Sequence, residues 1–279
     1  MSKPEDTPSE QAEAEAEDEG DDEQKGSTTI LAQSIQNAVN EFERPNSGLF
    51  LSGLSAGLDI GFGPLLMAVV LTLLGTESPE AFREFALANS YAVGFVFVII
   101  GRSELFTEHT TLAVLPVLDD RASLADLGRL WGVVYAGNIV GGTAFAFLAV
   151  TFAPEYGIAE TIAFAEIAGG LVNHSAVSLL TGGILAGWLM GLLAWLVVGA
   201  RETMSRLLLV WLVTLTIGLM HLPHSIAGNV EVLAGLFASD AVGYVDYGRF
   251  IVTATVGNAV GGAVFVALLK YGHVVRGGD

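Results

Sequence analysis

The sequence contains no cysteine, which excludes disulfide bridges, thiolate nucleophiles and thiolate metal sites. Charged residues are also scarce, at 15% of the chain, whereas 52% of the residues are hydrophobic and the mean hydropathy is +0.58. This composition is too apolar for an ordinary soluble domain. The net charge of −18 argues against nucleic acid as a partner. A lipid bilayer is therefore the expected solvent for most of the chain.

The net negative charge is concentrated near the amino terminus. Between Glu5 and Glu23 there are eleven acidic residues, no basic residue and no large apolar side chain. We therefore predict a disordered acidic tail over residues 1–26, and the segment lacks the basic and apolar regions of a signal peptide. From Ile30 to Phe42, apolar residues at near-helical spacing alternate with polar ones. This pattern predicts an amphipathic helix at the membrane interface over residues 27–46.

Long apolar segments predict how the rest of the chain crosses the membrane. A crossing needs about 20 apolar residues. Four segments meet this length without interruption: residues 49–75, 127–152, 176–198 and 250–271. Two more are interrupted, and each is expected to cross only when its two short halves are taken together: residues 85–100 with 107–118, and residues 207–220 with 227–238. The sequence thus predicts an all-α membrane domain of six crossings over residues 47–275, with both termini on one side.

The distribution of lysine and arginine predicts which side that is. Nine basic residues fall on the side of the termini: Lys3, Lys25, Arg44, Arg121, Arg129, Arg201, Arg206, Lys270 and Arg276. The opposite side has only Arg83 and Arg249. By the positive-inside rule, both termini are expected in the cytoplasm of a multi-pass plasma-membrane protein.

The two halves of the predicted membrane domain repeat each other. The motif Gly-Asn-x-Val-Gly-Gly occurs at residues 137–142 and again at 257–262, late in the third and sixth crossings. The repeats span about residues 47–153 and 176–275, and because each holds three crossings they enter the membrane from opposite sides. Glycines four residues apart in these crossings indicate close helix packing. The second crossing of each repeat is the interrupted one, and paired interruptions in an inverted repeat are the best sequence indication of a substrate pathway.

Polar side chains gather at the first interruption. Ionisable residues within a membrane are costly to insert, so each is a candidate functional residue. The candidates here and in the first crossing are Asp59, Arg102, Ser103, Glu104, Glu108 and His109. The bulky pair Leu105 and Phe106 comes directly before Thr107, which we expect to cap the restarting half-helix. The apolar pair is predicted to form a gate.

The second interruption contains His221, Pro223 and His224. Pro223 prevents smooth continuation of the helix, and Ser225 or Asn229 is expected to satisfy the freed backbone groups. A half-helix that begins here directs the positive end of its dipole into the membrane interior, which favours an anion. We regard His224 and Asn229 as candidate substrate and proton-relay residues, with His221 as a further polar residue of the loop.

Three motifs together resemble those of the formate/nitrite transporter family, in the same order and at similar separations. They are residues 103–107, the Gly-Asn-x-x-Gly element at 137–141, and residues 224–227. The resemblance covers about residues 30–275. It implies a homopentamer of aquaporin-like protomers, each with its own pore, that passes monovalent weak-acid anions such as formate, nitrite, acetate or hydrosulfide. It also implies that His224 is the central pore histidine and that Leu105, Phe106 and Thr107 form the constriction and gating loop.

The chain also departs from the pattern of that family. Members selective for formate or nitrite usually carry a lysine in the loop before the fourth crossing, and residues 169–174 contain none. His174 is a weak candidate to replace it. Pro223 before the central histidine, together with Arg102 and Asp59, also differs from the formate channels, which indicates a separate branch.

Three other interpretations remain open. One is a channel for a small neutral solute on the same architecture. Another is a membrane-embedded metal-dependent hydrolase using His221, His224 and either Asp59 or Glu108, although no zinc-hydrolase motif is present. The last is a structural or sensory protein with a closed pore. The preferred prediction is a proton-coupled anion channel or transporter that is not an enzyme and has no cofactor or metal, with the anion, the proton and the bilayer as its partners.

Overall fold

The computed structural model describes residues 25–75 and 77–277, and all regular secondary structure in these residues is helical. The acidic tail predicted for residues 1–26 lies, apart from residues 25 and 26, outside the described residues. The helices are α2 (Ser27–Glu43), α3 (Asn46–Ile60), α4 (Phe62–Leu74), α5 (Glu80–Gly101), α6 (Phe106–Leu112), α7 (Leu115–Leu118), α8 (Leu124–Glu155), α9 (Thr161–Val172), α10 (Ala176–Gly199), α11 (Thr203–Leu219), α12 (Ser225–Ala238), α13 (Tyr244–Gly262), the π-helical η1 (Ala263–Leu268) and α14 (Leu269–Gly277).

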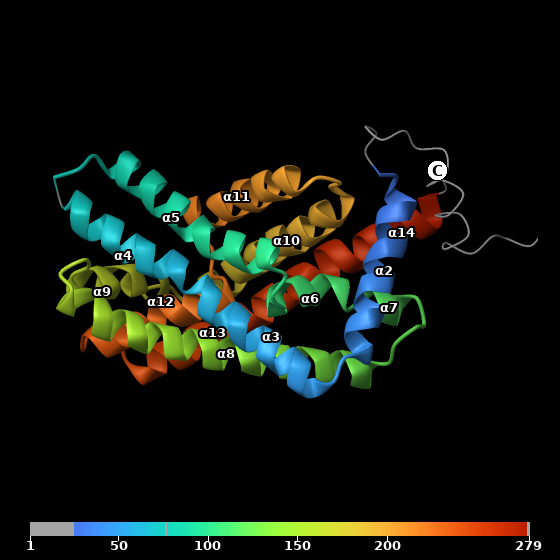
Figure 1. Ribbon diagram of the computed structural model, residues 1–279, viewed down its shortest axis with the longest axis horizontal. Helices are drawn as coiled ribbons and strands as arrows, with labels where there is room; N and C mark the ends of the chain where they lie inside the picture. Colours follow the sequence, from blue (N-terminus) through green and yellow to red (C-terminus); the bar gives the residue numbers. More distant parts are fainter. Residues whose placement is uncertain (1–24, 76, 278–279) are drawn as a thin grey trace, which may run out of the picture.

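The helix lengths agree with an all-helical membrane protein. Five helical stretches in the described residues are long and apolar enough to cross a bilayer: Asn46–Leu74, Glu80–Gly101, Leu124–Glu155, Ala176–Gly199 and Tyr244–Gly277. The 17-residue α11 and the 14-residue α12 share the remaining crossing. Helices α2 and α14 lie at one end of the molecule, and α9 with the α4–α5 connection lies at the other (Figure 1). We call these the proximal and distal ends.

Two predicted segments are divided in the structure. Residues 49–75 were expected to be uninterrupted, but α3 and α4 meet at Gly61, because Pro64 has no N–H to donate to the carbonyl of Ile60. Residues 107–118 were expected to be one half-helix, but they form α6 and α7, and Pro116 likewise cannot donate to Leu112. In contrast, α5 is longer than expected, since its 22 residues are sufficient to cross alone.

Helix α9 is absent from the sequence prediction, which treated residues 169–174 as a loop. Its 12 residues are too short to cross a bilayer, and its buried side chains pack against α12 and α13 near Val232 and Phe250. This helix supports the distal end of α12 and so contributes to the position of the second interruption.

The inverted repeat is visible in how the helices pair. Helix α3 packs along α8 in the first half, and α10 packs along α13 in the second. Where α3 contacts α8, a Cβ on Gly57 would meet the carbonyl oxygen of Asn138. Where α10 contacts α13, a Cβ on Gly187 would meet the carbonyl oxygen of Asn258. The spaced glycines therefore act as predicted, allowing the backbones to approach closely.

Helix α2 spans the proximal end next to α14 (Figure 1). Its extent agrees with the amphipathic helix expected over residues 27–46. Its buried side chains Ile30, Leu31 and Ile35 pack in a cluster that includes Leu115 and Trp195. The apolar face is thus covered by protein, and the location of α2 at the membrane interface stays a prediction.

Candidate functional site

The two interruptions meet in the middle of the molecule. Helix α6 begins after the first interruption and α12 after the second, and a 2.8 Å hydrogen bond joins Thr107 Oγ1 to Nε2 of His224. Both side chains are buried, with exposed fractions of 0% and 1%. Residues far apart in the sequence are therefore brought into direct contact where the two half-helices start.

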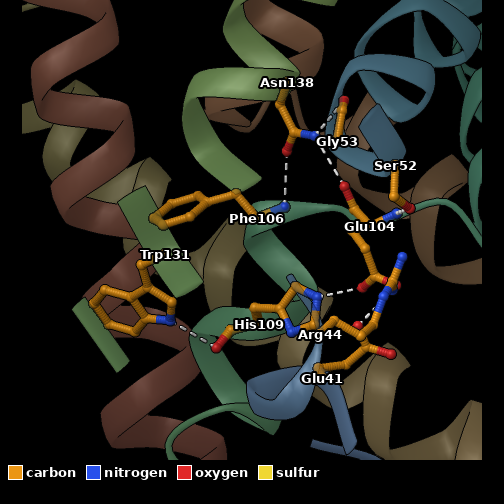
Figure 2. Close-up of polar contacts among 9 residues, drawn as sticks. All are labelled: Glu41, Arg44, Ser52, Gly53, Glu104, Phe106, His109, Trp131 and Asn138. Atoms are coloured by element: carbon orange, nitrogen blue, oxygen red, sulfur yellow. Dashed lines mark hydrogen bonds and ion pairs between the residues drawn. The ribbon is translucent and has the colours of Figure 1, made fainter. Parts of the chain in front are cut away.

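One asparagine holds the first interruption in place. The backbone N–H of Phe106 donates to Oδ1 of Asn138 at 2.8 Å, and Nδ2 of Asn138 donates to the carbonyls of Gly53 at 2.8 Å and Glu104 at 2.9 Å (Figure 2). The start of α6 is therefore capped by a side chain of α8. The expectation that Thr107 caps this helix is wrong, because its hydroxyl is bonded to His224.

The second interruption repeats this arrangement. The N–H of Ser225 donates to Oδ1 of Asn258 at 2.7 Å, and Nδ2 of Asn258 donates to the carbonyls of Gly183 at 2.8 Å and Pro223 at 2.9 Å. Asn258 thus performs the task that was expected of Ser225 or Asn229. In the sequence, Asn138 and Asn258 appear only as members of the repeated motif, although their equal positions in the two halves could have indicated a shared role.

The hydrogen bonds of His224 define its tautomer. Its Nδ1 accepts the backbone N–H of Ala227 at 3.1 Å, so this nitrogen carries no proton. The neutral ring must then carry its proton on Nε2 and donate it to Thr107. The ring of Phe95, which is fully buried, packs edge-on against the imidazole with 4.9 Å between ring centres. Phe95 was not among the residues that the sequence singled out.

The apolar residues of the first interruption differ in their surroundings. Leu105 is fully buried and precedes α6. The ring of Phe106 packs against two aromatic side chains of α8, at 5.0 Å from Tyr135 and 5.8 Å from Trp131, and the indole N–H of Trp131 donates to the carbonyl of His109 (Figure 2). Both residues lie next to Thr107, but Phe106 is anchored on α8.

A cavity of about 430 Å³ opens on the proximal side of this contact. We call it the proximal cavity, and its polar lining comprises Asn37, Glu41, Arg102, Ser103, Glu104, Glu108, His109, Thr203 and Arg206. Among these residues, Glu104 makes several polar contacts. It accepts from Nε2 of His109 at 2.5 Å and pairs with Arg44 at 2.7 Å, while its own N–H donates to Ser52 (Figure 2).

Arg44 links α2 to the first interruption, because it pairs with Glu41 at 2.5 Å as well as with Glu104. Burial raises the pKa of the Glu41 carboxyl, the charge of Glu104 raises it further, and Arg44 opposes both. A carboxyl whose pKa is raised in the folded state stabilises that state below its unfolded pKa and loses this contribution as the pH rises through the raised value. Glu41 therefore favours docking of α2 in mildly acidic solution.

Of two further residues predicted in the first half, Arg102 lines the proximal cavity and Asp59 does not. Arg102 ends α5 in the left-handed region at φ 59° and is exposed in the cavity. Asp59 does not line this cavity. It accepts hydrogen bonds from Ser55 at 3.1 Å and Ser103 at 3.5 Å, and it connects α3 to the first interruption.

A second cavity, of about 210 Å³, lies on the distal side between α4, α5, α9, α11 and α12. We call it the distal cavity. Its polar side chains are Glu84, Tyr91, Glu166, His221 and Glu231. His221 is largely exposed and bonds Glu84 at 2.9 Å. His174 is exposed and does not line this cavity.

Asn229 is buried but lines neither cavity. Its Oδ1 accepts the hydroxyl proton of Tyr247 at 2.8 Å, and its Nδ2 has no hydrogen-bond partner in the described part of the chain. The structure thus brings His224 and Thr107 together but directs Asn229 toward α13.

The metal-dependent hydrolase receives no support from the geometry. Within residues 25–75 and 77–277, no three His, Cys, Asp or Glu side chains come together to hold a metal ion. Asp59 bonds Ser55 and Ser103, and His221 bonds Glu84, so neither accompanies His224.

Comparison with known proteins agrees with this architecture. The family model described as formate/nitrite transporter matches residues 28–272. The chain belongs to the formate/nitrite transporter family. It is therefore a multi-pass membrane protein of a transporter family and not a hydrolase.

Several relatives of this family are similar over most of their length. The inner membrane protein YfdC of Escherichia coli K12 is 30% identical over 86% of this chain and 76% of its own. A probable formate transporter of Methanothermobacter thermautotrophicus is 29% identical over 77% of this chain and 85% of its own.

Solved structures show the same fold. An FNT family ion channel matches with a TM-score of 0.78 and 24% identity over 88% of this chain and 98% of its own. A pentameric formate channel with formate bound matches with a TM-score of 0.71 and 24% identity over 81% of this chain and 96% of its own. At this identity the likeness shows that the chain has the formate/nitrite transporter fold.

Proposed function

We propose that this member of the formate/nitrite transporter family carries small monovalent weak-acid anions, of the formate, nitrite, acetate or hydrosulfide type, together with a proton. The observation that carries the proposal is the Thr107–His224 hydrogen bond, which joins the two interruptions between the proximal and distal cavities. A hydrogen-bonding pair at this depth gives a small polar solute a place to bind between two apolar barriers.

The electrostatics of α12 favour an anion at that place. The helix begins at Ser225, so its partly positive end points to the middle of the molecule beside His224. The Nε2–H of His224 and the hydroxyl of Thr107 are both able to donate to an oxygen of the solute. An anion that replaced the Thr107–His224 bond would gain two donors in a low-dielectric setting.

Passage through the adjoining apolar segments favours the uncharged acid. The ring of Phe95 packs against His224 and offers no polar atom, and the buried Leu105 comes two residues before Thr107. A bare anion would lose hydration worth many kcal/mol there, whereas the neutral acid loses far less. This difference is the physical reason for coupling transport to a proton.

His224 is proposed as charge partner and proton relay, with one structural condition. To become a cation the ring must place a second proton on Nδ1, which now accepts the N–H of Ala227. Relay through His224 therefore requires that this bond opens during each cycle. Leu105, Phe106 and Thr107 are proposed as the constriction and gating loop.

The assembly and location are proposed from the relatives. A matching structure is that of a pentameric formate channel, and a relative is named as an inner membrane protein. We propose a homopentamer in the plasma membrane, with one pathway in each protomer and the proximal end facing the cytoplasm. A channel for a small neutral solute is the second candidate, favoured by the absence of lysine and arginine among the described residues that line the distal cavity.

Flux measurements in proteoliposomes test the proposal. We expect the purified protein to take up formate, nitrite, acetate or hydrosulfide faster when an inward proton gradient is imposed. The His224→Ala variant should lose this uptake, and His273→Ala, on the exposed face of α14, should retain it. Unchanged anion uptake in His224→Ala, or uptake of neutral solutes alone, would contradict the proposal.

A further inference from the structure

The distal cavity contains a carboxyl group that the proposed function does not yet use. Glu231 of α12 lines the cavity with an exposed fraction of 6%. Within the described residues it makes no hydrogen bond and no ion pair. The hydroxyl of Tyr91, also in the lining, likewise has no hydrogen-bond partner there. A buried acidic side chain thus faces an open volume without a partner.

The other two carboxylates of the cavity are different, because each has a partner. Glu84 bonds His221 at 2.9 Å, and Arg83 lies 3.8 Å from Glu84 and 3.4 Å from Glu166. The charged and titratable side chains that line the cavity opposite Glu231 are Glu84 and Tyr91 from α5, Glu166 from α9 and His221 from the loop before α12. From α13, Tyr247 is engaged by Asn229.

A buried, unpaired carboxylate calls for a positively charged ligand, since leaving the charge uncompensated in a membrane protein is costly. A metal ion fits poorly. Hard cations such as Ca²⁺ and Mg²⁺ need about six or more oxygen ligands, and no three acidic or histidine side chains of the described residues converge on one point. Most of the remaining lining is apolar: Met67, Leu71, Leu87, Ile167, Leu171, Ile217 and Leu222. A proton needs only one oxygen, so it is the ligand that fits.

Glu231 lies on the pathway to His224. His224 directly precedes α12 and Glu231 lies about two helical turns further on, so the two residues are about 10 Å apart along the axis of α12. The ring of Tyr91 packs against Phe95 at 5.0 Å, and Phe95 packs against His224 at 4.9 Å. Phe95 therefore separates the distal cavity from the Thr107–His224 pair.

We propose that Glu231 is the site at which the weak-acid anion receives its proton in the distal cavity. The un-ionised Glu231 gives up the proton of its O–H bond, and a new bond to that proton forms on an oxygen or sulfur of the anion. The neutral acid then moves past Phe95 to His224, and a hydronium ion that enters the distal cavity down the proton gradient returns a proton to the Glu231 carboxylate and leaves as water. The inference rests on the proposed function and assigns the loading of the proton to a residue other than His224.

The charged groups of the distal cavity restrict which substrates the Glu231 site can serve. Arg83 pairs with Glu84 and Glu166 from outside the lining, and no lysine or arginine is among the described residues that line the distal cavity, so this lining offers an anion no cation to bind. The substrate must then be an anion that can take a proton. Formate and acetate meet this condition, whereas chloride and nitrate, as anions of strong acids, do not.

The decisive experiment compares Glu231→Gln with wild-type protein in proteoliposomes. Formate uptake and internal acidification are recorded together under an inward proton gradient. We expect Glu231→Gln to lower both by at least about ten-fold, because the amide keeps the size of the side chain but cannot supply the proton. The matched control Glu160→Gln changes an exposed glutamate at the start of α9 and should behave as wild type. Chloride and nitrate should not be taken up by any variant.

The outcomes separate the inference from the function on which it rests. Weak-acid uptake that needs His224 but is unchanged in Glu231→Gln would overturn the inference and leave the function standing. Uptake that follows a sodium or potassium gradient instead of the proton gradient would identify a metal cation at Glu231 and also overturn it. Absence of weak-acid uptake in the wild type would overturn the function itself.

A second measurement on the wild type covers the case in which Glu231→Gln does not fold. Dicyclohexylcarbodiimide, an apolar carbodiimide, reacts with protonated carboxyl groups in membranes. Mass spectrometry should find its adduct on Glu231, and formate in excess should reduce the yield. An unmodified Glu231 in protein whose other carboxyl groups react would contradict the inference.

Discussion

At the scale of single residues, Asn138 and Asn258 hold the interruption of the second crossing in each repeat. Each uses Oδ1 to accept the first N–H of a half-helix and Nδ2 to donate to two backbone carbonyls. An interrupted helix at membrane depth leaves backbone groups that lipid cannot satisfy. One amide side chain per repeat meets this need, and each comes from the third crossing of its own half.

Replacing either asparagine should therefore destabilise the fold. Asn138→Ala and Asn258→Ala each leave a buried N–H without a partner, and we expect a cost of about 2–4 kcal/mol for each. The measurement is the thermal unfolding midpoint of the detergent-solubilised protein, with Asn40→Ala on the exposed face of α2 as control. Midpoints for Asn138→Ala and Asn258→Ala equal to that of the control would show that the bonds do not hold the interruptions.

Thr107 provides the second prediction at this scale. Thr107→Val keeps the shape of the side chain but removes the acceptor for the Nε2–H of His224, and a buried N–H without a partner costs about 1–3 kcal/mol. The solute also loses one of its two donors, and we expect weak-acid flux to fall by about ten-fold, since about 1.4 kcal/mol of lost binding corresponds to a factor of ten. Thr107→Ser, which restores the hydroxyl, should recover most of the flux. Equal flux in the Val and Ser variants would mean that the hydroxyl is not used.

At the scale of helices, the crossing of α3 with α8 depends on glycine. A Cβ on Gly57 would overlap the carbonyl of Asn138, and the overlapping atom belongs to the backbone, which cannot move aside alone. Gly57→Ala should push the helices apart and destabilise the protein by about 1–3 kcal/mol. Gly132→Ala on α8 is the matched control, because a Cβ there meets nothing within 4 Å. The control should be neutral or stabilising by about 0.5–1 kcal/mol. Similar losses for both glycines would argue against the close approach.

The attachment of α2 to the first interruption can be tested through Arg44. Arg44→Gln removes the pairs with Glu41 and Glu104, both partly exposed, which we expect to cost about 1 kcal/mol. Hydrogen exchange of backbone amides in residues 27–43 should then be about five-fold faster. Arg276→Gln, near the end of α14, removes the same charge from an exposed site and should leave this exchange unchanged. Equal protection in the Arg44 variant would show that α2 is held by its apolar face alone.

The sequence predicted the crossings and their interruptions because both depend on local composition. The length of the apolar segments predicts the crossings. Pro223 and the polar residues around Arg102 predict where two of them are interrupted. The division at Gly61 and the separation of α6 from α7 follow from Pro64 and Pro116, which the apolar pattern alone conceals. Helix α9 escaped prediction because its 12 residues, which are mostly apolar, are too few to cross a bilayer and their apolar pattern is too weakly periodic to identify a helix. The contact of Thr107 with His224 and the place of Phe95 depend on the folding of the two halves onto each other.

At the scale of the whole molecule, the two ends differ in charge. The difference lies in the basic residues: Arg44, Arg121, Arg129, Arg206 and Lys270 lie around the described proximal end, whereas Arg83 and Arg249 lie at the distal end. By the positive-inside rule we propose that the proximal end lies in the cytoplasm. In that orientation the distal cavity faces outward, where an inward proton gradient would meet Glu231 first.

The absence of cysteine allows this orientation to be tested without a background of native thiols. Single-cysteine variants are placed at exposed positions of each end: His273→Cys and Leu124→Cys at the proximal end, Ala81→Cys and Glu160→Cys at the distal end. In intact cells a membrane-impermeant maleimide should label the two distal cysteines, because they face outward, and should label the proximal pair only after the cells are permeabilised. Labelling of the proximal pair in intact cells would reverse the orientation. In that case Glu231 would face the cytoplasm, and loading of the proton at Glu231 would favour export of the weak acid instead of its uptake.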